Sequence, residues 1–281
     1  MDIDYYTKII TELNQELLKD LLSSLRDMVF DENISQNQPI GKDYFSSLIS
    51  VSFSAFDPFV PPPEQPNPSL GTCYYYIGLM DTAVDPVKLK PLPKLREEFV
   101  EGIENCFSES GKKDRWVKAI RSLETDDNFA DMNLTELTNF SEDLLKKKSL
   151  DLITEISSGH AVILLTMTKL VATVQEKALV LIDEPECHLH PPLLSSFIRA
   201  LSELLHNRNG VAIIATHSPV VLQEIPKSCV WKIIRSRLTL VGNRPDIQTF
   251  VENVGVLTRE IFGLEVSKSG FALKSAFSYN K

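Results

Sequence analysis

The chain has 281 residues, and its 29 Lys and Arg against 38 Asp and Glu give a formal net charge of −9. A chain of this length folds into one or two domains with a full hydrophobic core. A hydrophobic content of 43% with 24% charged residues excludes a disordered chain or a fibre. The acidic balance disfavours a protein that coats nucleic acid, because such proteins need a basic surface. Local contact with nucleic acid stays possible.

The four cysteines form no CxxC pair, which is typical of a reduced, cytoplasmic protein rather than a disulfide framework. The first ten residues are acidic and do not have the basic-then-apolar order of a signal peptide. The most apolar stretch, residues 161–174, is too short and too polar to span a bilayer, which takes about 20 apolar residues. We therefore expect a cytoplasmic protein with no membrane partner.

The N-terminal third predicts a helix, a strand and then an irregular segment. Residues 5–29 carry apolar side chains at steps of three and four, as in an amphipathic helix. Residues 48–59 alternate and are rich in β-branched and aromatic residues, as in a strand. Nine of the 16 prolines then fall between Pro58 and Pro93, which excludes a central strand or a helix interior there. We expect this segment to wrap the surface and to hold one short strand at residues 74–78.

The second half has the pattern of an α/β core. After a charged, helical stretch over residues 94–150, a helix is predicted at 161–174, a strand at 178–182, a helix at 193–205 and a strand at 211–215. Short apolar runs that alternate with helices indicate parallel strands covered on both faces.

We therefore predict a partly parallel sheet flanked by helices, with a helical insertion subdomain. The expected organisation is an N-terminal helix and strand of the core (1–60), a proline-rich and helical insertion (61–150) and the main α/β core (151–281).

Polar residues follow both apolar strands of this core. The first strand ends in Asp183 and Glu184, and the second is followed by Thr216 and His217. In an open parallel sheet, ligands bind beyond the carboxyl ends of the strands, so neighbouring strands would bring these groups to one edge. Asp183 could then hold Mg²⁺, Glu184 could accept a proton from an attacking water, and His217 could contact a terminal phosphate. The alternative is that the acids only begin a turn and that His217 caps a helix.

A second candidate segment, Ser157-Ser158-Gly159-His160, comes directly before the apolar helix. Serine at a helix start satisfies free backbone amides, and those amides with the helix dipole can bind an anion. The tetrapeptide alone is equally typical of a plain helix cap.

In this order, SSGH, ALVLIDEPECHLHP and AIIATHSP resemble the signature, Walker B, D-loop and switch-histidine segments of ABC-type ATPases. The similarity is nearest to the branch with RecF-like, SMC-like and OLD-like proteins. Within that branch the chain resembles PtuA-like ATPase subunits of Septu and retron anti-phage systems. The resemblance covers roughly residues 45–80 and 150–275.

The resemblance implies a role for each matching residue and a set of partners. Asp183 would bind Mg²⁺, Glu184 would be the general base and His217 the γ-phosphate sensor. Nucleotide contacts would come from five further residues: Ser157, Ser158, Gly159, His160 and, in the D-loop, His190. ATP with Mg²⁺ would be bound between two heads, so a homodimer or a higher homo-oligomer is implied. A partner nuclease is implied by the defence systems alone.

One expected element is absent from the sequence: no GxxxxGK followed by Ser or Thr occurs. Gly41-Lys42 lacks the earlier glycine and the hydroxyl, and Gly111-Lys112 fails in the same way. A truncated, split or degenerate member is therefore one interpretation, with ATP hydrolysis only if a phosphate-binding loop is supplied. The alternatives are a non-hydrolysing dimerisation scaffold for an effector and a RecF- or SMC-like DNA-repair ATPase. A zinc site at residues 187–190 is a further, weaker interpretation than the D-loop.

Overall fold

The computed structural model describes residues 44–53, 60–84, 86–236 and 239–263. The described residues up to Thr216 belong to one compact unit, and those from His217 onward belong to a second. The helix predicted over residues 5–29, Gly41-Lys42 and the end of the strand predicted over 48–59 lie outside the described residues.

The first unit is built on a four-stranded parallel sheet with the order β2-β1-β5-β6. Its strands are β1 (Ser47–Ser52), β2 (Cys73–Gly78), β5 (Ala178–Asp183) and β6 (Val211–Ala215). Burial is deepest in the two central strands, where Ile49 and Val180 are fully buried. The α/β fold with a parallel sheet and flanking helices is thus confirmed, as is the pairing of the two apolar runs.

One helix precedes β5 in the chain, and another follows it. They are α7 (Ser158–Thr173), which leads into β5, and α8 (Pro191–His206), which leads from β5 to β6. Prolines occupy the first turn of α8, where no backbone N–H partner is needed. Past its end, Asn209 adopts a positive φ of 47° before Gly210 begins the return to β6. Both helices and the stop at Asn209-Gly210 match the sequence pattern.

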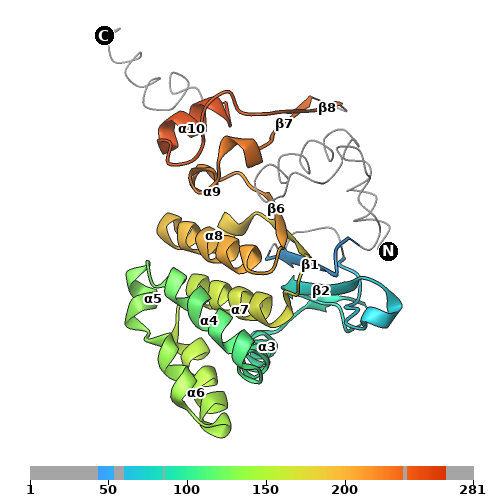
Figure 1. Ribbon diagram of the computed structural model, residues 1–281, viewed down its shortest axis with the longest axis vertical. Coiled ribbons are helices and arrows are strands. Elements are labelled where there is room, and N and C mark those ends of the chain that lie inside the picture. The colour runs from blue at the N-terminus through green and yellow to red at the C-terminus, as the bar shows by residue number, and fades with distance from the viewer. Residues whose placement is uncertain (1–43, 54–59, 85, 237–238, 264–281) are drawn as a thin grey trace, which may run out of the picture. The chain divides into compact units, whose positions relative to one another are not determined.

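The predicted helical stretch packs against α7 and α8 within the same unit (Figure 1). It contains α3 (Leu92–Phe107), α4 (Ser110–Leu123), α5 (Asp127–Asp131), the 3₁₀ turn Leu134–Asn139 and α6 (Glu142–Glu155). Trp116 is fully buried and its indole N–H donates to the hydroxyl of Thr168 on α7, at 3.0 Å. This subdomain thus shares a core with α7. The domain boundary expected at residue 150 stays a prediction.

The proline-rich segment contributes little regular structure. It contains the 3₁₀ turn Pro68–Leu70 and the short strands β3 (Met80–Asp81) and β4 (Lys88–Leu89), which pair with each other outside the main sheet. The one strand expected within it is present as β2. β2 is the last strand on its side of the described sheet, where a proline-rich neighbourhood is tolerated.

The second unit is smaller and has its own apolar core. Its elements are α9 (Pro219–Gln223), the 3₁₀ turn Lys227–Cys229, β7 (Lys232–Ser236), β8 (Thr239–Asn243) and α10 (Val254–Glu260). β7 and β8 form an antiparallel hairpin. Leu222 of α9, Val230 and Leu257 of α10 form the core, with Ile261 beside them.

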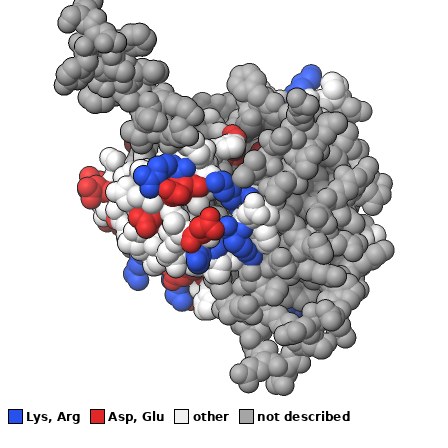
Figure 2. All heavy atoms as spheres, turned by 90° about the horizontal axis from the view of Figure 1, so that it is seen from above, with Lys and Arg blue, Asp and Glu red and all other residues white. Residues whose placement is uncertain are grey.

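The described helices include none that is long and apolar enough to cross a membrane. On the face drawn in Figure 2, the Lys and Arg side chains of the described residues lie among Asp and Glu side chains.

Candidate functional site

Three strand ends meet at the carboxyl edge of the sheet. In the parallel register Ser52 of β1 lies beside Asp183 of β5, and Asp183 lies beside Ala215 of β6. Residues in register on parallel strands point to the same face of the sheet. Because Asp183 is the last residue of β5, Asp183 and Glu184 lie at the carboxyl edge of the sheet, where open α/β sheets bind their ligands.

The turn after β5 has an unusual backbone. Glu184 adopts a left-handed conformation, with φ 43° and ψ 60°, and its amide donates to the carbonyl of Ala215 at 2.9 Å. A non-glycine residue in this region costs on the order of 1 kcal/mol or more and persists only where its surroundings fix it. The strain thus falls on the residue whose carboxylate the sequence predicts to be the general base.

Two hydrogen bonds hold the acidic turn. The hydroxyl of Thr216 donates to Oε2 of Glu186 at 2.9 Å, which ties the turn to the end of β6. The thiol of Cys187 donates to Oε2 of Glu184 at 3.3 Å. Desolvation, with this hydrogen bond and the charges of Glu184, Glu186 and Asp183, raises the pKa of the Cys187 thiol to about 11. The thiol therefore stays protonated at neutral pH and remains a donor to Glu184.

A small, shallow hollow, open to solvent, lies at these strand ends. Its lining comes from the end of β1, the middle of α7 and the acidic turn: Val51, Phe53, Val162, Thr166, Asp183 and Glu184 are among the lining residues. The 3₁₀ turn Pro185–His188 closes one side, where an imidazole nitrogen of His188 lies 3.2 Å from the carbonyl oxygen of Phe53. The acid pair thus borders a concave surface.

Ser157-Ser158-Gly159-His160 begins α7, as predicted. Ser157 is the N-cap residue, and Ser157 and Ser158 are exposed. A Cβ on Gly159 would lie 2.8 Å from the backbone carbonyl oxygen of His188, so the signature-like segment and the D-loop-like turn touch through a glycine. The Ser157 hydroxyl lies 2.6 Å from Nδ1 of His160, and the contact of both serines with nucleotide stays a prediction.

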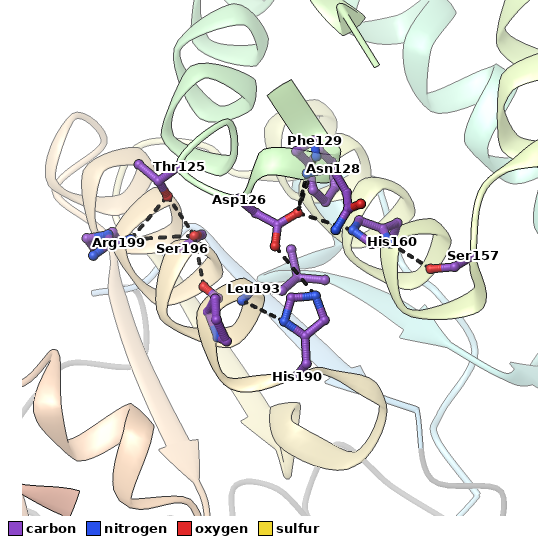
Figure 3. Close-up of polar contacts among 11 residues, drawn as sticks. Thr125, Asp126, Asn128, Phe129, Ser157, His160, His190, Leu193, Ser196 and Arg199 are labelled. Atoms are coloured by element: carbon purple, nitrogen blue, oxygen red, sulfur yellow. Dashed lines mark hydrogen bonds and ion pairs between the residues drawn. The ribbon is translucent and has the colours of Figure 1, made fainter. Parts of the chain in front are cut away.

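His160 and His190, which the sequence predicts to contact nucleotide, bond to other residues of the first unit. His160 is buried, with its ring directed at Asp126 of the helical subdomain (Figure 3). His190 is the N-cap residue of α8, and its Nδ1 accepts from the amide of Leu193. Their predicted role at the nucleotide stays a prediction.

His217 follows Thr216 directly and is the first residue of the second unit. Thr216 lies next to the acidic turn through its bond to Glu186. That His217 contacts a terminal phosphate of the nucleotide stays untested.

Ser52 was missed by the sequence reasoning. Its hydroxyl is buried and makes no hydrogen bond among the described residues, although it lies in register with Asp183. An orphaned oxygen beside a carboxylate fits Mg²⁺, which takes oxygen ligands and keeps several waters or phosphate oxygens. The signal was a hydroxyl at the last position of an apolar strand, but the sequence did not show which strand would lie beside β5.

Gly111-Lys112, one of the two Gly-Lys segments that do not match a phosphate loop, lies in a helix. Gly111 and Lys112 lie in the first turn of α4, and the Lys112 ammonium bonds to Asn105 and pairs with Glu109. Lys112 is thus engaged within the helical subdomain. The described residues contain an acid pair with a buried hydroxyl in register beside it, and they contain no glycine-rich cradle for phosphates.

A parallel α/β sheet flanked by helices, with an acid pair at the end of a buried strand, is consistent with an α/β P-loop NTPase core. The chain belongs to the family described as "AAA domain, putative AbiEii toxin, Type IV TA system", which matches residues 28–223. It is 53% identical to Protein ea59 of Escherichia phage lambda over 249 residues, which is 83% of this chain and 47% of that protein. The chain thus spans about half the length of this relative.

Proposed function

We propose that the chain is an ATP-binding and ATP-hydrolysing head of the ABC type. The observation that carries the proposal is the register Ser52–Asp183–Ala215, which places the acid pair and an orphaned hydroxyl at one edge of the sheet. Membership of an AAA-domain family supports it.

The proposed roles follow from the chemistry of each group. Asp183, with the hydroxyl of Ser52, would hold Mg²⁺, which when bound neutralises charge on the phosphate oxygens. Glu184 would orient a water molecule and accept its proton. Ser157 and Ser158, exposed at the start of α7, would contact nucleotide bound to a second copy of the chain, so ATP would promote a homodimer.

A phosphate-binding loop has to come from outside the described residues. β6 is the last strand on its side of the described sheet, and its residues are only partly buried. A further strand that carries such a loop can pair there, from another polypeptide or from another part of the same protein.

The test is ATP binding and turnover by the chain. We expect Mg²⁺-dependent binding by isothermal titration, and we expect Asp183→Asn to weaken it at least tenfold. Ser122→Ala, a change on α4 away from the acidic turn, is the control and should bind as the wild type does. Binding that is absent, or equal in all three proteins, would contradict the proposed site.

A second candidate function is a scaffold that dimerises and holds an effector without hydrolysing ATP. The specific observation in its favour is that no GxxxxGK followed by Ser or Thr occurs in the 281 residues. A dimer in solution that neither binds nor turns over ATP would support this candidate. A RecF- or SMC-like role in DNA repair would require the same ATP-dependent dimer together with DNA binding.

We further propose that the head is the ATPase or nucleotide-sensing subunit of an anti-phage complex that controls a partner nuclease. The support is the similarity of the motifs to PtuA-like subunits of Septu and retron systems. Cells that express the chain with its genomic neighbours should plate phage at lower efficiency, and Glu184→Gln should abolish the protection. Equal plating with wild type, variant and empty vector would contradict this role.

A further inference from the structure

Three side chains from three separate elements converge beside the start of α8 (Figure 3). Asp126 is the N-cap residue of α5, His160 lies in the first turn of α7 and His190 is the N-cap residue of α8. Nε2 of His160 lies 3.3 Å from Oδ1 of Asp126, and Nε2 of His190 lies 3.5 Å from Oδ2. Each residue offers one ligand atom, and the three atoms lie within 4.8 Å of one another.

We propose that Asp126, His160 and His190 bind a zinc ion. Tetrahedral ligands with bonds of about 2.0–2.1 Å to zinc lie roughly 3.3 Å from one another. Each imidazole nitrogen lies close to one oxygen of the carboxylate, His160 to Oδ1 at 3.3 Å and His190 to Oδ2 at 3.5 Å, and one ligand atom from each residue lies within 4.8 Å of the other two. The His190 side chain is 46% exposed, so its ring can move to bring the three ligand atoms to tetrahedral spacing.

The surroundings of the two buried ligands suit a metal. Oδ1 of Asp126 accepts the backbone amides of Asn128 and Phe129, which fixes the carboxylate and directs Oδ2 toward His190. A carboxylate oriented in this way can act as a zinc ligand.

The far side of each imidazole matters because a metal on Nε2 requires the proton on Nδ1. Nδ1 of His160 lies 2.6 Å from the hydroxyl oxygen of Ser157, which can accept that proton and orient the ring. Nδ1 of His190 accepts a hydrogen bond from the Leu193 amide at a long 3.5 Å. With zinc on Nε2, Nδ1 would carry a proton and this weak helix cap would be lost. Pro191 and Pro192 have no N–H, so little else at the start of α8 depends on it.

Two nitrogens and one carboxylate select a metal of the zinc type rather than Mg²⁺ or Ca²⁺, which prefer oxygen. His160 is buried and His190 is half exposed, so the fourth position would face solvent and take a water. The ion would join the helical subdomain to the first turns of α7 and α8. This site is separate from the Mg²⁺ expected at Asp183, and it does not depend on the proposed function.

The test is zinc binding by the full chain after removal of metal with a chelator. A competition titration against a chromophoric chelator should give one tight site per chain, and zinc should raise the Tm by several degrees. His190→Gln should remove the tight site and the rise in Tm. It is the preferred variant because His190 is half exposed, so the substitution leaves the buried core intact. His206→Gln, at the other end of α8, is the matched control and should keep both.

Co²⁺ gives a second reading, because four-coordinate Co²⁺ absorbs strongly in the visible range and the band should be lost only in His190→Gln and Asp126→Asn. No tight zinc site in the wild type would overturn the proposal and leave a hydrogen-bonded cluster. Equal binding by His190→Gln and His206→Gln would overturn it too. Loss of binding in His188→Gln with retention in His190→Gln would place the metal at the neighbouring turn and equally overturn it.

Discussion

Replacing Glu98 with alanine is expected to lower the free energy of unfolding by about 3–5 kcal/mol, because it leaves two largely buried ammonium groups without their shared partner. The two oxygens of Glu98 on α3 lie 2.7 Å from Nζ of Lys90 and 2.9 Å from Nζ of Lys169 on α7. The exposed side-chain fractions of Lys90, Glu98 and Lys169 are 6%, 15% and 17%, so water cannot replace the carboxylate easily.

The pH dependence of this variant has a defined sign. Burial lowers the pKa of Lys90 from its usual 10.5, while the bond to Glu98 acts to raise it. Without Glu98 the pKa falls further, so the unfolded chain binds more protons than the folded chain between that lowered pKa and 10.5. Stability rises with pH wherever the unfolded state binds more protons. The variant should therefore regain part of its stability as the pH rises through this range.

Glu104→Ala is the matched control on the same helix. Glu104 pairs with Lys146 at 3.1 Å, but the Lys146 side chain is 63% exposed. Exposed pairs contribute up to about 1 kcal/mol, so this change should have a small effect. Urea unfolding of both variants at neutral and alkaline pH measures the difference. Equal losses in the two variants would show that burial does not set the cost at Glu98.

The helices and strands of the core could be predicted from the sequence because apolar runs and turn residues delimit each of them. The apolar runs became β5 and β6, and the prolines and the Asn209-Gly210 stop fixed the ends of α8. The acid pair could be located at a strand end since side chains after a buried strand must leave the sheet at its carboxyl edge.

Contacts between residues far apart in the sequence could not be predicted from the sequence alone. Ser52 gains its meaning from the register with Asp183, about 130 residues along the chain, which no local pattern encodes. Asp126 lies within the charged stretch over residues 94–150, and only the packing of the helical subdomain on α7 brings it to His160. His160 and His190 were linked to nucleotide by motif alone, whereas both also lie within 3.5 Å of the Asp126 carboxylate, which the motif does not contain.

In an assembly that supplies the phosphate-binding loop, replacing Glu184 with glutamine is expected to lower ATP turnover by about 10²–10⁴-fold, the usual contribution of a positioned general base. Glutamine keeps the size of the side chain but cannot accept the proton of the attacking water. ATP binding should persist, so the variant should accumulate ATP-dependent dimers, visible by size-exclusion chromatography with light scattering.

Glu186→Gln is the matched control, because Glu186 lies two residues away in the same turn and receives the hydroxyl of Thr216. A glutamine carbonyl still accepts that hydrogen bond, so turnover should change only a few-fold. The left-handed backbone at residue 184 sharpens the contrast, since both substitutions leave this strained turn in place and differ only in which carboxylate is lost. If turnover survives Glu184→Gln, or if the two variants lose it equally, Glu184 is not the proton acceptor and the strain at this residue has another cause.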